Sequence, residues 1–365
     1  MLLTSRHPGL ILSRDLAALG LDDAELRRAC RRGELVGVRR GAYVESALWR
    51  RLGVDERYRL TVVAAAAACR TRVVVSHLSA AVLHGLPLVG APPPVVHVLV
   101  APPGGSRREH GFVKHARSDY DLPGLPQIDG VLVTPVETTL VDVCLTESFL
   151  RAVVMTDHAL RIGAVTLEQL AQEFASRDTA RGATRVRAVL QFASPLSAGP
   201  LESVSRVGFR LLGLPDPVLQ HPLFDATGRR VAIVDNWWPH AGAVGESDGR
   251  IKYTDPAVMN GRTVEQVVID EKHREDEIRS LPEVQGFARW GWSTALDTRR
   301  LGEVLARAGV SPESTARKRA SSIETGASGG PFPPDSPADG GPAAGERTGR
   351  ERPGGTSRAS GRVAR

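Results

Sequence analysis

The first forty-odd residues alternate short amphipathic segments with glycine stops. Gly20 and Gly33 each follow a segment whose apolar residues repeat at helical spacing, and glycine commonly ends a helix. Two short apolar runs then flank a turn at residues 39–41. Two helices followed by a hairpin form the outline of a winged helix-turn-helix. The predicted elements are helices at 14–19 and 23–32 and strands at 35–38 and 42–44.

The rest of the chain divides by pattern into three further regions. Helical periodicity dominates residues 51–193, with apolar strands at 95–100 and 131–134. A turn-rich segment precedes a helix, three strands, a helix and a strand within residues 200–300. From residue 311 the chain is rich in Gly, Pro and Ser, and we expect disorder. The pattern predicts an α+β multidomain protein: a winged helix at 1–50, a mostly helical region at 51–193, an α/β unit at 200–300 and a tail at 311–365.

Length and charge narrow the class of protein. The 365 residues are 42% hydrophobic, which excludes disorder of the whole chain. The longest apolar run, residues 60–69, is about half of what a membrane span needs, so we expect a cytoplasmic protein without membrane contact. The net charge of +6 lies at the two ends: residues 1–44 hold eight Arg against five carboxylates, and residues 311–365 hold nine Lys and Arg against six. Only a folded end can present a shaped basic patch.

Cysteine and histidine spacing gives no sign of a metal or disulfide framework. The three cysteines are far apart and form no C-x-x-C pair. His77 and His84 would share a helix face, but two histidines do not make a metal site, and helix surface or core edge is the expected environment for such a pair.

The second predicted helix carries a concentrated basic face. Its inward stripe is apolar, whereas arginines stack at four-residue spacing on the other side. The hairpin tip adds a second basic point, and together these suit a recognition helix in the major groove with a wing at the backbone. Charge alone leaves RNA open as a target, and a solvated basic face is the alternative. The candidate DNA-binding residues are Arg27, Arg28, Arg31, Arg32, Arg39 and Arg40.

Residues 13–44, closing on G-x-L-x-x-V-x-R-G-x-Y-V with one extra Arg at 39, resemble the N-terminal winged helix of the AbiEi antitoxins of type IV toxin–antitoxin systems. The segment S-H-L-S-A-A-V-L-H-G-L-P at 76–87 is similar to the region that follows it in those proteins. This resemblance implies a bacterial repressor that binds double-stranded DNA and is paired with a nucleotidyltransferase-type toxin.

Clustered acid marks the C-terminal unit. Val231 to Asp235 is an apolar run ending in a carboxylate, and Glu246 and Asp248 share one face of the next strand. Antiparallel pairing of the two strands can bring Asp235 beside Glu246. Neighbouring carboxylates repel unless a cation joins them, and an oxygen-ligand site suits Mg²⁺. Lys252 follows, and Glu202 in the preceding helix could add a third carboxylate or form an ordinary ion pair with Arg206.

The order helix-Glu, strand-Asp, strand-E-x-D-G and a charged helix resembles the PD-(D/E)xK, restriction-endonuclease-like superfamily, closest to very-short-patch-repair endonucleases. Similar V-D-x-x-W-P, E-x-D-G-x-x-K-Y and E-K-x-R-E-D runs recur in actinobacterial relatives. The resemblance implies that Asp235 and Glu246 are metal ligands, Glu202 an auxiliary one and Lys252 the catalytic lysine. The superfamily lysine should lie two residues after the acid, where this chain has Asp248.

Two hypotheses follow. In the first, the chain is a Mg²⁺-dependent DNA endonuclease, with catalytic residues Asp235, Glu246, Lys252 and Glu202 and metal ligands Asp235, Glu246 and Asp248. In the second, it is a non-enzymatic AbiEi-like antitoxin and repressor whose nuclease-like unit is an inactive scaffold.

Overall fold

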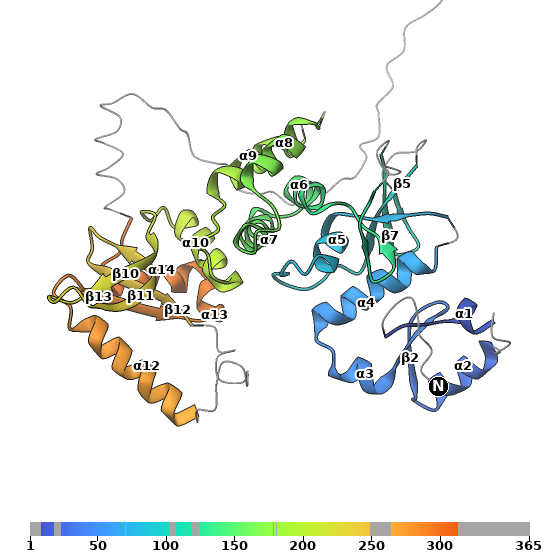
Figure 1. The fold of residues 1–365 in the computed structure, drawn as a ribbon, viewed down its shortest axis with the longest axis horizontal. Coiled ribbons are helices and arrows are strands. Elements are labelled where there is room, and N and C mark those ends of the chain that lie inside the picture. Colours follow the sequence, from blue (N-terminus) through green and yellow to red (C-terminus); the bar gives the residue numbers. More distant parts are fainter. Residues whose placement is uncertain are drawn as a thin grey trace, which may run out of the picture. The chain divides into compact units, whose positions relative to one another are not determined.

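The computed structural model describes residues 9–17, 23–69, 71–101, 107–117, 124–177, 179, 181–248 and 264–312 (Figure 1). Lys252 and the tail from residue 313 onwards lie outside these ranges. Across the described residues, no helix combines the length and the apolar character needed to cross a lipid bilayer.

The N-terminal module has the two helices and the hairpin that its pattern predicts. Leu26 and Ala29 are buried on the inner side of α2, as the helical stripe requires. Gly41 adopts a φ of +76°, which the turn of the hairpin needs and which glycine tolerates without strain. The strand order is β1-β3-β2, all antiparallel. The elements are β1 (Ile11–Leu12), α1 (Ser13–Ala17), α2 (Asp23–Arg31), β2 (Leu35–Arg39) and β3 (Ala42–Glu45).

The middle region contains a sheet in addition to its helices, which qualifies the expectation of a mostly helical region. The four strands have the order β4-β5-β7-β6, with β5 and β7 parallel. β6 and β7 escaped prediction because they carry Arg, Lys and His in place of an apolar run. The elements are α3 (Ser46–Arg51), α4 (Val54–Ala67), β4 (Val74–Val75), α5 (His77–Leu83), β5 (Val96–Val100), β6 (Arg107–Glu109), β7 (Phe112–Ala116), β8 (Gln127–Ile128) and β9 (Val131–Leu132).

Four further helices pack around a second apolar core. Leu140, Val153, Met155, Leu170 and Val189 are almost fully buried in this core. The ends of two of the helices are capped by their own side chains, because the hydroxyls of Ser148 and Thr166 accept backbone hydrogen bonds. The elements are α6 (Val136–Thr146), α7 (Phe149–Arg161), α8 (Leu167–Ala175) and α9 (Ala183–Phe192).

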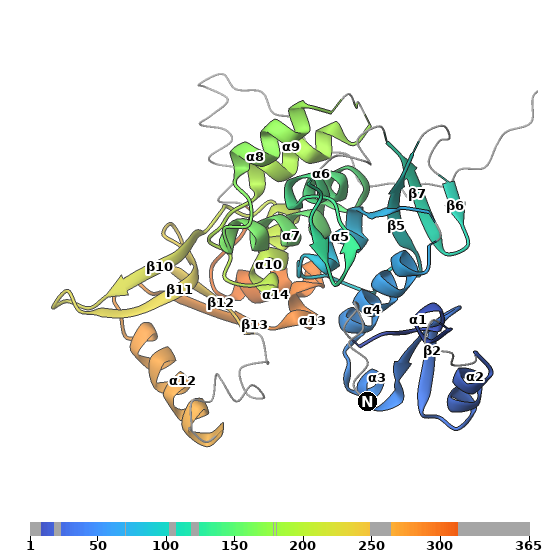
Figure 2. The same ribbon diagram turned by 45° about the vertical axis from the view of Figure 1, so that its right-hand side comes forward.

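The C-terminal unit is a four-stranded mixed sheet with helices on its two faces. The strand order is β10-β11-β12-β13; the first three are antiparallel and β13 runs parallel to β12. α10 and α14 pack with Trp238 and Trp290, whereas Ile278 of α12 packs with Val234 and Val244. β10 and β11 form a long hairpin (Figure 2). The elements are α10 (Pro200–Leu211), β10 (Val218–Phe224), β11 (Arg230–Trp238), β12 (Ala243–Ser247), α12 (Val264–Arg279), β13 (Gly286–Trp290), α13 (Trp292–Ala295) and α14 (Thr298–Arg307).

The last strand of the unit ends at Trp290, and the core of the unit continues past residue 300, where the predicted α/β unit ends. Trp292 begins α13 and does not extend the strand. Leu301 and Leu305 of α14 are fully buried, so this helix belongs to the same core. Gly245 faces Trp238 and Trp290 so closely that a Cβ would lie 2.7 Å from an atom of the Trp290 ring. This close approach explains why β12 has a glycine directly before Glu246.

The turn-rich segment before α10 is fastened by a buried carboxylate. Asp157 of α7 is fully buried and accepts hydrogen bonds from Ser194 N and Ser203 Oγ, both at 2.8 Å, and from Arg206 Nη1 at 2.7 Å. Burial raises the pKa of Asp157, while Arg206 acts in the opposite direction. A buried charge is tolerated only when it is paired and hydrogen-bonded, as it is here. The segment therefore ties α10 to α7.

Candidate functional site

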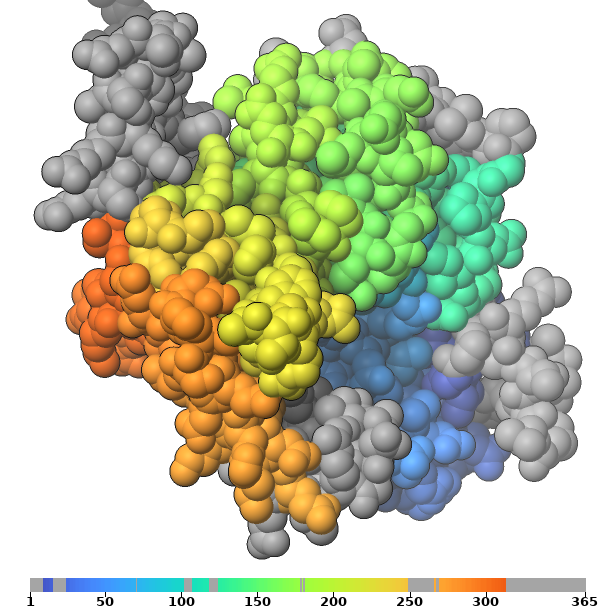
Figure 3. All heavy atoms as spheres, turned by 60° about the vertical axis from the view of Figure 1, so that its left-hand side comes forward, coloured from blue at the N-terminus to red at the C-terminus, as the bar shows by residue number. Residues whose placement is uncertain are grey.

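The acidic residues of the C-terminal unit line one pocket. It lies where β11, β12 and β13 meet α12, and α12 runs beside the β10–β11 hairpin on this surface (Figure 3). Carboxylates and guanidiniums make up almost the whole lining, so the pocket is suited to charged or strongly polar ligands. The lining residues are Asp235, Glu246, Ser247, Asp248, Glu271, Arg274 and Arg289.

Strand pairing places Asp235 beside Glu246. β11 and β12 pair antiparallel with Asn236 opposite Gly245, so the residues that flank this pair are neighbours. The backbone N–H and the hydroxyl of Ser247 both donate to Asp235 Oδ2, at 2.9 Å each. These bonds fix the Asp235 carboxylate at the pocket. Its assignment as a metal ligand or catalytic residue stays a prediction.

Two arginines hold Glu246, and the sequence interpretation missed both. Arg274 Nη2 lies 2.9 Å from Glu246 Oε1, and Arg289 Nη2 lies 3.2 Å from Oε2. Burial raises the pKa of Glu246, and the charge of Asp235 adds to the shift, while both arginines oppose it. Arg289 stands directly opposite Glu246 in the β12–β13 register, a pairing that could be found only once β13 is known to lie parallel to β12.

Asp248 occupies the position that the resemblance assigns to a lysine. It lines the same pocket, and its backbone N–H donates to Trp290 O at 2.7 Å. Its Oδ1 atom is buried and has no hydrogen-bond partner among the described residues. Lys252 falls outside the described part of the chain, so its catalytic role stays a prediction.

Glu202 does not line the pocket within the part of the chain that the structure describes. Its Oε2 atom accepts hydrogen bonds from Ala198 N at 2.8 Å and from Gln220 Nε2 at 3.1 Å. Arg206, the ion-pair partner weighed for it, contacts Asp157. The structure therefore brings Asp235, Glu246 and Asp248 together and assigns Glu202 a position at the start of α10.

The donor chemistry of this set fits a hard divalent cation. Four carboxylates, those of Asp235, Glu246, Asp248 and Glu271, line one pocket, and the buried Oδ1 of Asp248 lacks a hydrogen-bond partner among the described groups. Oxygen ligands of this kind suit Mg²⁺. The ion would share Glu246 with Arg274 and Arg289, which already supply positive charge there.

The predicted DNA-binding arginines differ in their surroundings. Those of α2, with Arg32 just beyond it, are exposed, as is Arg40 in the turn. Arg32 is bound by Glu34 through two hydrogen bonds of 2.6 and 2.9 Å. Arg39 lies over the Phe112 ring and donates to His110 O at 2.7 Å, so it contacts the β6–β7 hairpin. Burial lowers the pKa of Arg39. The exposed arginines on α2 are Arg27, Arg28 and Arg31.

Comparison with known proteins bears on the N-terminal module. Residues 1–46 match a family model described as "Transcriptional regulator, AbiEi antitoxin". No curated protein matches the sequence. Among solved structures, the chain is similar to the crystal structure of the RV2827C protein from Mycobacterium tuberculosis, at 16% identity and a TM-score of 0.30, over 54% of this chain and 75% of that one. The match over residues 1–46 supports the interpretation of the N-terminal module as part of a DNA-binding regulator.

Proposed function

We propose that this protein is a DNA-binding transcriptional regulator of the AbiEi antitoxin type. The observation that carries the proposal is the AbiEi match over residues 1–46, within which α2 exposes Arg27, Arg28 and Arg31. Like charges at four-residue spacing destabilise an isolated helix, and an anionic partner relieves the repulsion. Guanidiniums along one helix can contact phosphates and guanine edges in the major groove. Duplex DNA is therefore the partner that this surface favours.

The test removes charge from α2 and measures the salt dependence of DNA binding. Arg27→Ala with Arg31→Ala should weaken binding to the DNA upstream of the gene by about tenfold or more, and should reduce the slope of log K against log salt by about 2. Fluorescence anisotropy across a salt series gives both quantities. Arg299→Ala with Arg307→Ala removes the same charge from an exposed face of α14 and serves as the matched control. Equal binding by the two double variants would remove α2 from the interface.

An antitoxin also binds a toxin, and the resemblance implies one of nucleotidyltransferase type. Support for a protein-binding role of the C-terminal unit comes from its long hairpin, where Val218, Phe224 and Ile233 are 45%, 47% and 42% exposed. Apolar side chains exposed on one hairpin are available to a protein partner. Ile233→Asp should then prevent co-purification with such a toxin, whereas Leu211→Asp, at a 71% exposed position of α10, should not.

Metal-dependent cleavage of DNA is the second candidate function. The order of helix, three antiparallel strands, helix and parallel strand, with Asp235 and Glu246 on adjacent strands, supports a PD-(D/E)xK-like unit. Asp235, Glu246 and Asp248 would hold Mg²⁺, which supplies Lewis-acid activation of water and charge stabilisation at phosphate. Ser247 orients the Asp235 carboxylate for that role through its two hydrogen bonds.

The decisive experiment for this candidate is plasmid nicking with and without Mg²⁺. If the unit is a nuclease, wild-type protein nicks with Mg²⁺, Asp235→Ala does not, and both bind DNA equally. Asp276→Ala changes an exposed carboxylate of α12 that does not line the pocket, and it should nick like wild type. Absence of nicking by wild type, or equal nicking by Asp235→Ala, would exclude the assignment and leave the regulator alone.

A further inference from the structure

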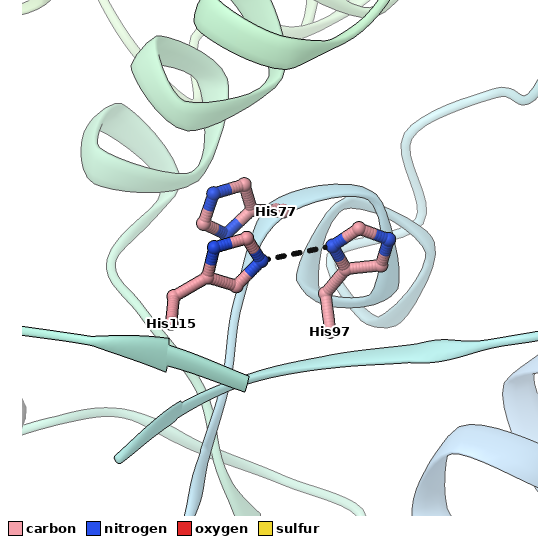
Figure 4. Close-up of side chains that lie close together, drawn as sticks. All are labelled: His77, His97 and His115. Atoms are coloured by element: carbon pink, nitrogen blue, oxygen red, sulfur yellow. Dashed lines mark hydrogen bonds between the residues drawn. The ribbon is translucent and has the colours of Figure 1, made fainter. Parts of the chain in front are cut away.

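Three histidines from separate elements of the middle region meet beneath α5. His77 is the first residue of α5, His97 lies in β5 and His115 lies in β7 (Figure 4). His115 is paired in register with Leu99, two residues beyond His97 on the neighbouring parallel strand, so both side chains emerge from the same face of the sheet. One ring nitrogen from each histidine lies within 4.8 Å of the other two.

The contacts between the three rings are close and specific. His97 Nδ1 and His115 Nε2 are 3.1 Å apart, and the rings of His77 and His115 stack with centroids 3.7 Å apart. His84, which the pattern places on one helix face with His77, lies with its Nε2 2.8 Å from Thr134 O. The cluster could not be found from spacing within one helix, because its members are 20 and 18 residues apart in sequence.

Their surroundings keep all three imidazoles neutral near pH 7. Burial lowers the pKa of His97 and that of His115 to about 4, and it lowers the pKa of His77 as well, with the neighbouring rings adding to the effect. A neutral imidazole is the form that binds a metal ion, so no net release of protons is needed. The proton of the hydrogen bond between His97 Nδ1 and His115 Nε2 moves to the other nitrogen of its ring when both bind the ion.

The first histidine is oriented from outside the cluster. His77 Nδ1 lies 2.9 Å from Ser76 Oγ and 3.6 Å from Asp142 Oδ2. A carboxylate behind a histidine is a common means of orienting a metal ligand. His77 also has a φ of +52°, a costly conformation for a residue other than glycine. The strained backbone conformation is therefore located at His77, the residue that α5 contributes to the cluster.

We propose that His77, His97 and His115 form a binding site for a borderline divalent metal ion of the Zn²⁺ class. Bonds of about 2.0–2.1 Å from two nitrogens 3.1 Å apart meet at about 100° at the ion, close to tetrahedral geometry. The rings of His77 and His115 are stacked, so their nitrogen lone pairs lie in parallel planes and do not point at one ion. The His77 ring therefore has to rotate before its nitrogen can bind the same ion. The ion joins α5 to β5 and β7, next to the β6–β7 hairpin that Arg39 contacts.

The test is a metal titration of the full-length protein after chelator treatment. Wild type should bind one equivalent of Zn²⁺, measured by competition with a chromophoric chelator, and with Co²⁺ it should give the visible absorption of a four- or five-coordinate nitrogen site. His97→Gln and His115→Gln should each weaken Zn²⁺ binding by about 100-fold or more, whereas His273→Ala on α12 should bind like wild type. Asp142→Asn should weaken binding by about 10–100-fold through the orientation of His77.

Two results would overturn the proposal: absence of Zn²⁺ binding by wild type, or one-equivalent binding that survives both glutamine substitutions. X-ray absorption of the Zn²⁺-loaded wild type decides the matter even where a variant does not fold. It should show three imidazole nitrogens at about 2.0–2.1 Å, and a spectrum with fewer imidazoles would contradict the site.

Discussion

The acidic pocket of the C-terminal unit and the histidine cluster of the middle region are both groups of metal-ligand side chains, but they differ in charge. In the pocket, Glu246 already faces the guanidiniums of Arg274 and Arg289. In the cluster, burial keeps the three imidazoles uncharged. The acidic motif stands out in sequence, yet two arginines of the chain already pair with its Glu246. The scattered histidines carry no motif, and their nitrogen atoms converge.

This contrast predicts opposite selectivity. A hard ion such as Mg²⁺ must share Glu246 with two arginines, whereas a Zn²⁺-class ion meets neutral nitrogen donors. The two sites also respond to pH in opposite directions. The pKa of Glu246 is raised, so its contribution to stability is present below the ordinary pKa of a glutamate and is lost as pH rises through the pKa in the folded state. The pKa values of His97 and His115 are lowered, so their contribution is present above the ordinary pKa of histidine and is lost as pH falls.

The largest expected effect is acid destabilisation through the histidine cluster. Because the folded-state pKa values of His97 and His115 are lowered to about 4, the unfolded chain binds more protons between pH 6.5 and that value. Stability present above pH 6.5 should fall by roughly 3 kcal/mol on going to about pH 4.5. Urea unfolding at both pH values measures it. His97→Gln with His115→Gln should flatten this pH dependence, and an unchanged slope in the double variant would assign the acid sensitivity elsewhere.

The sequence predicts contacts between residues that lie close together along the chain better than contacts between distant ones. Helix 23–32 was predicted to within one residue of its observed bounds, Asp23–Arg31, because its apolar stripe lies within the segment and its glycine stop follows at once. Asp235 and Glu246 could be paired because a single hairpin joins their strands. Arg289 and the histidine cluster depend on parallel pairings, β12 with β13 and β5 with β7, whose partners lie across crossovers. Alternation within a strand cannot reveal which distant strand lies beside it.

A charge-pair cycle in the acidic pocket is expected to give an intermediate effect. Arg289→Met leaves Glu246, whose side chain is 9% exposed, with Arg274 as its arginine partner, and should destabilise the fold by about 1–3 kcal/mol. Glu246→Gln with Arg289→Met should recover most of that loss, because the buried charge is removed together with its partner. Denaturant unfolding of the four proteins gives the coupling energy. Additive losses would mean that the arginine does not compensate Glu246.

The smallest expected effect is the difference in stability between substitutions of Arg39, which contacts the β6–β7 hairpin, and Arg40, which is exposed. Arg39→Ala loses the contact with Phe112 and the bond to His110 O, and should reduce stability by about 1 kcal/mol. Arg40→Ala, at an exposed turn position, should change stability by less than about 0.5 kcal/mol while weakening DNA binding. Thermal unfolding and anisotropy of both variants separate the two effects. Equal stability losses would show that the hairpin contact of Arg39 contributes nothing.

A footprint on the DNA upstream of the gene, taken with Mg²⁺ present, asks whether α2 directs this protein to DNA as a regulator. We expect a protected segment for wild type and for Asp235→Ala, loss of protection for Arg27→Ala with Arg31→Ala, and intact DNA strands throughout. Protection that persists in the double arginine variant, or no protection by wild type, would rule out this role of α2.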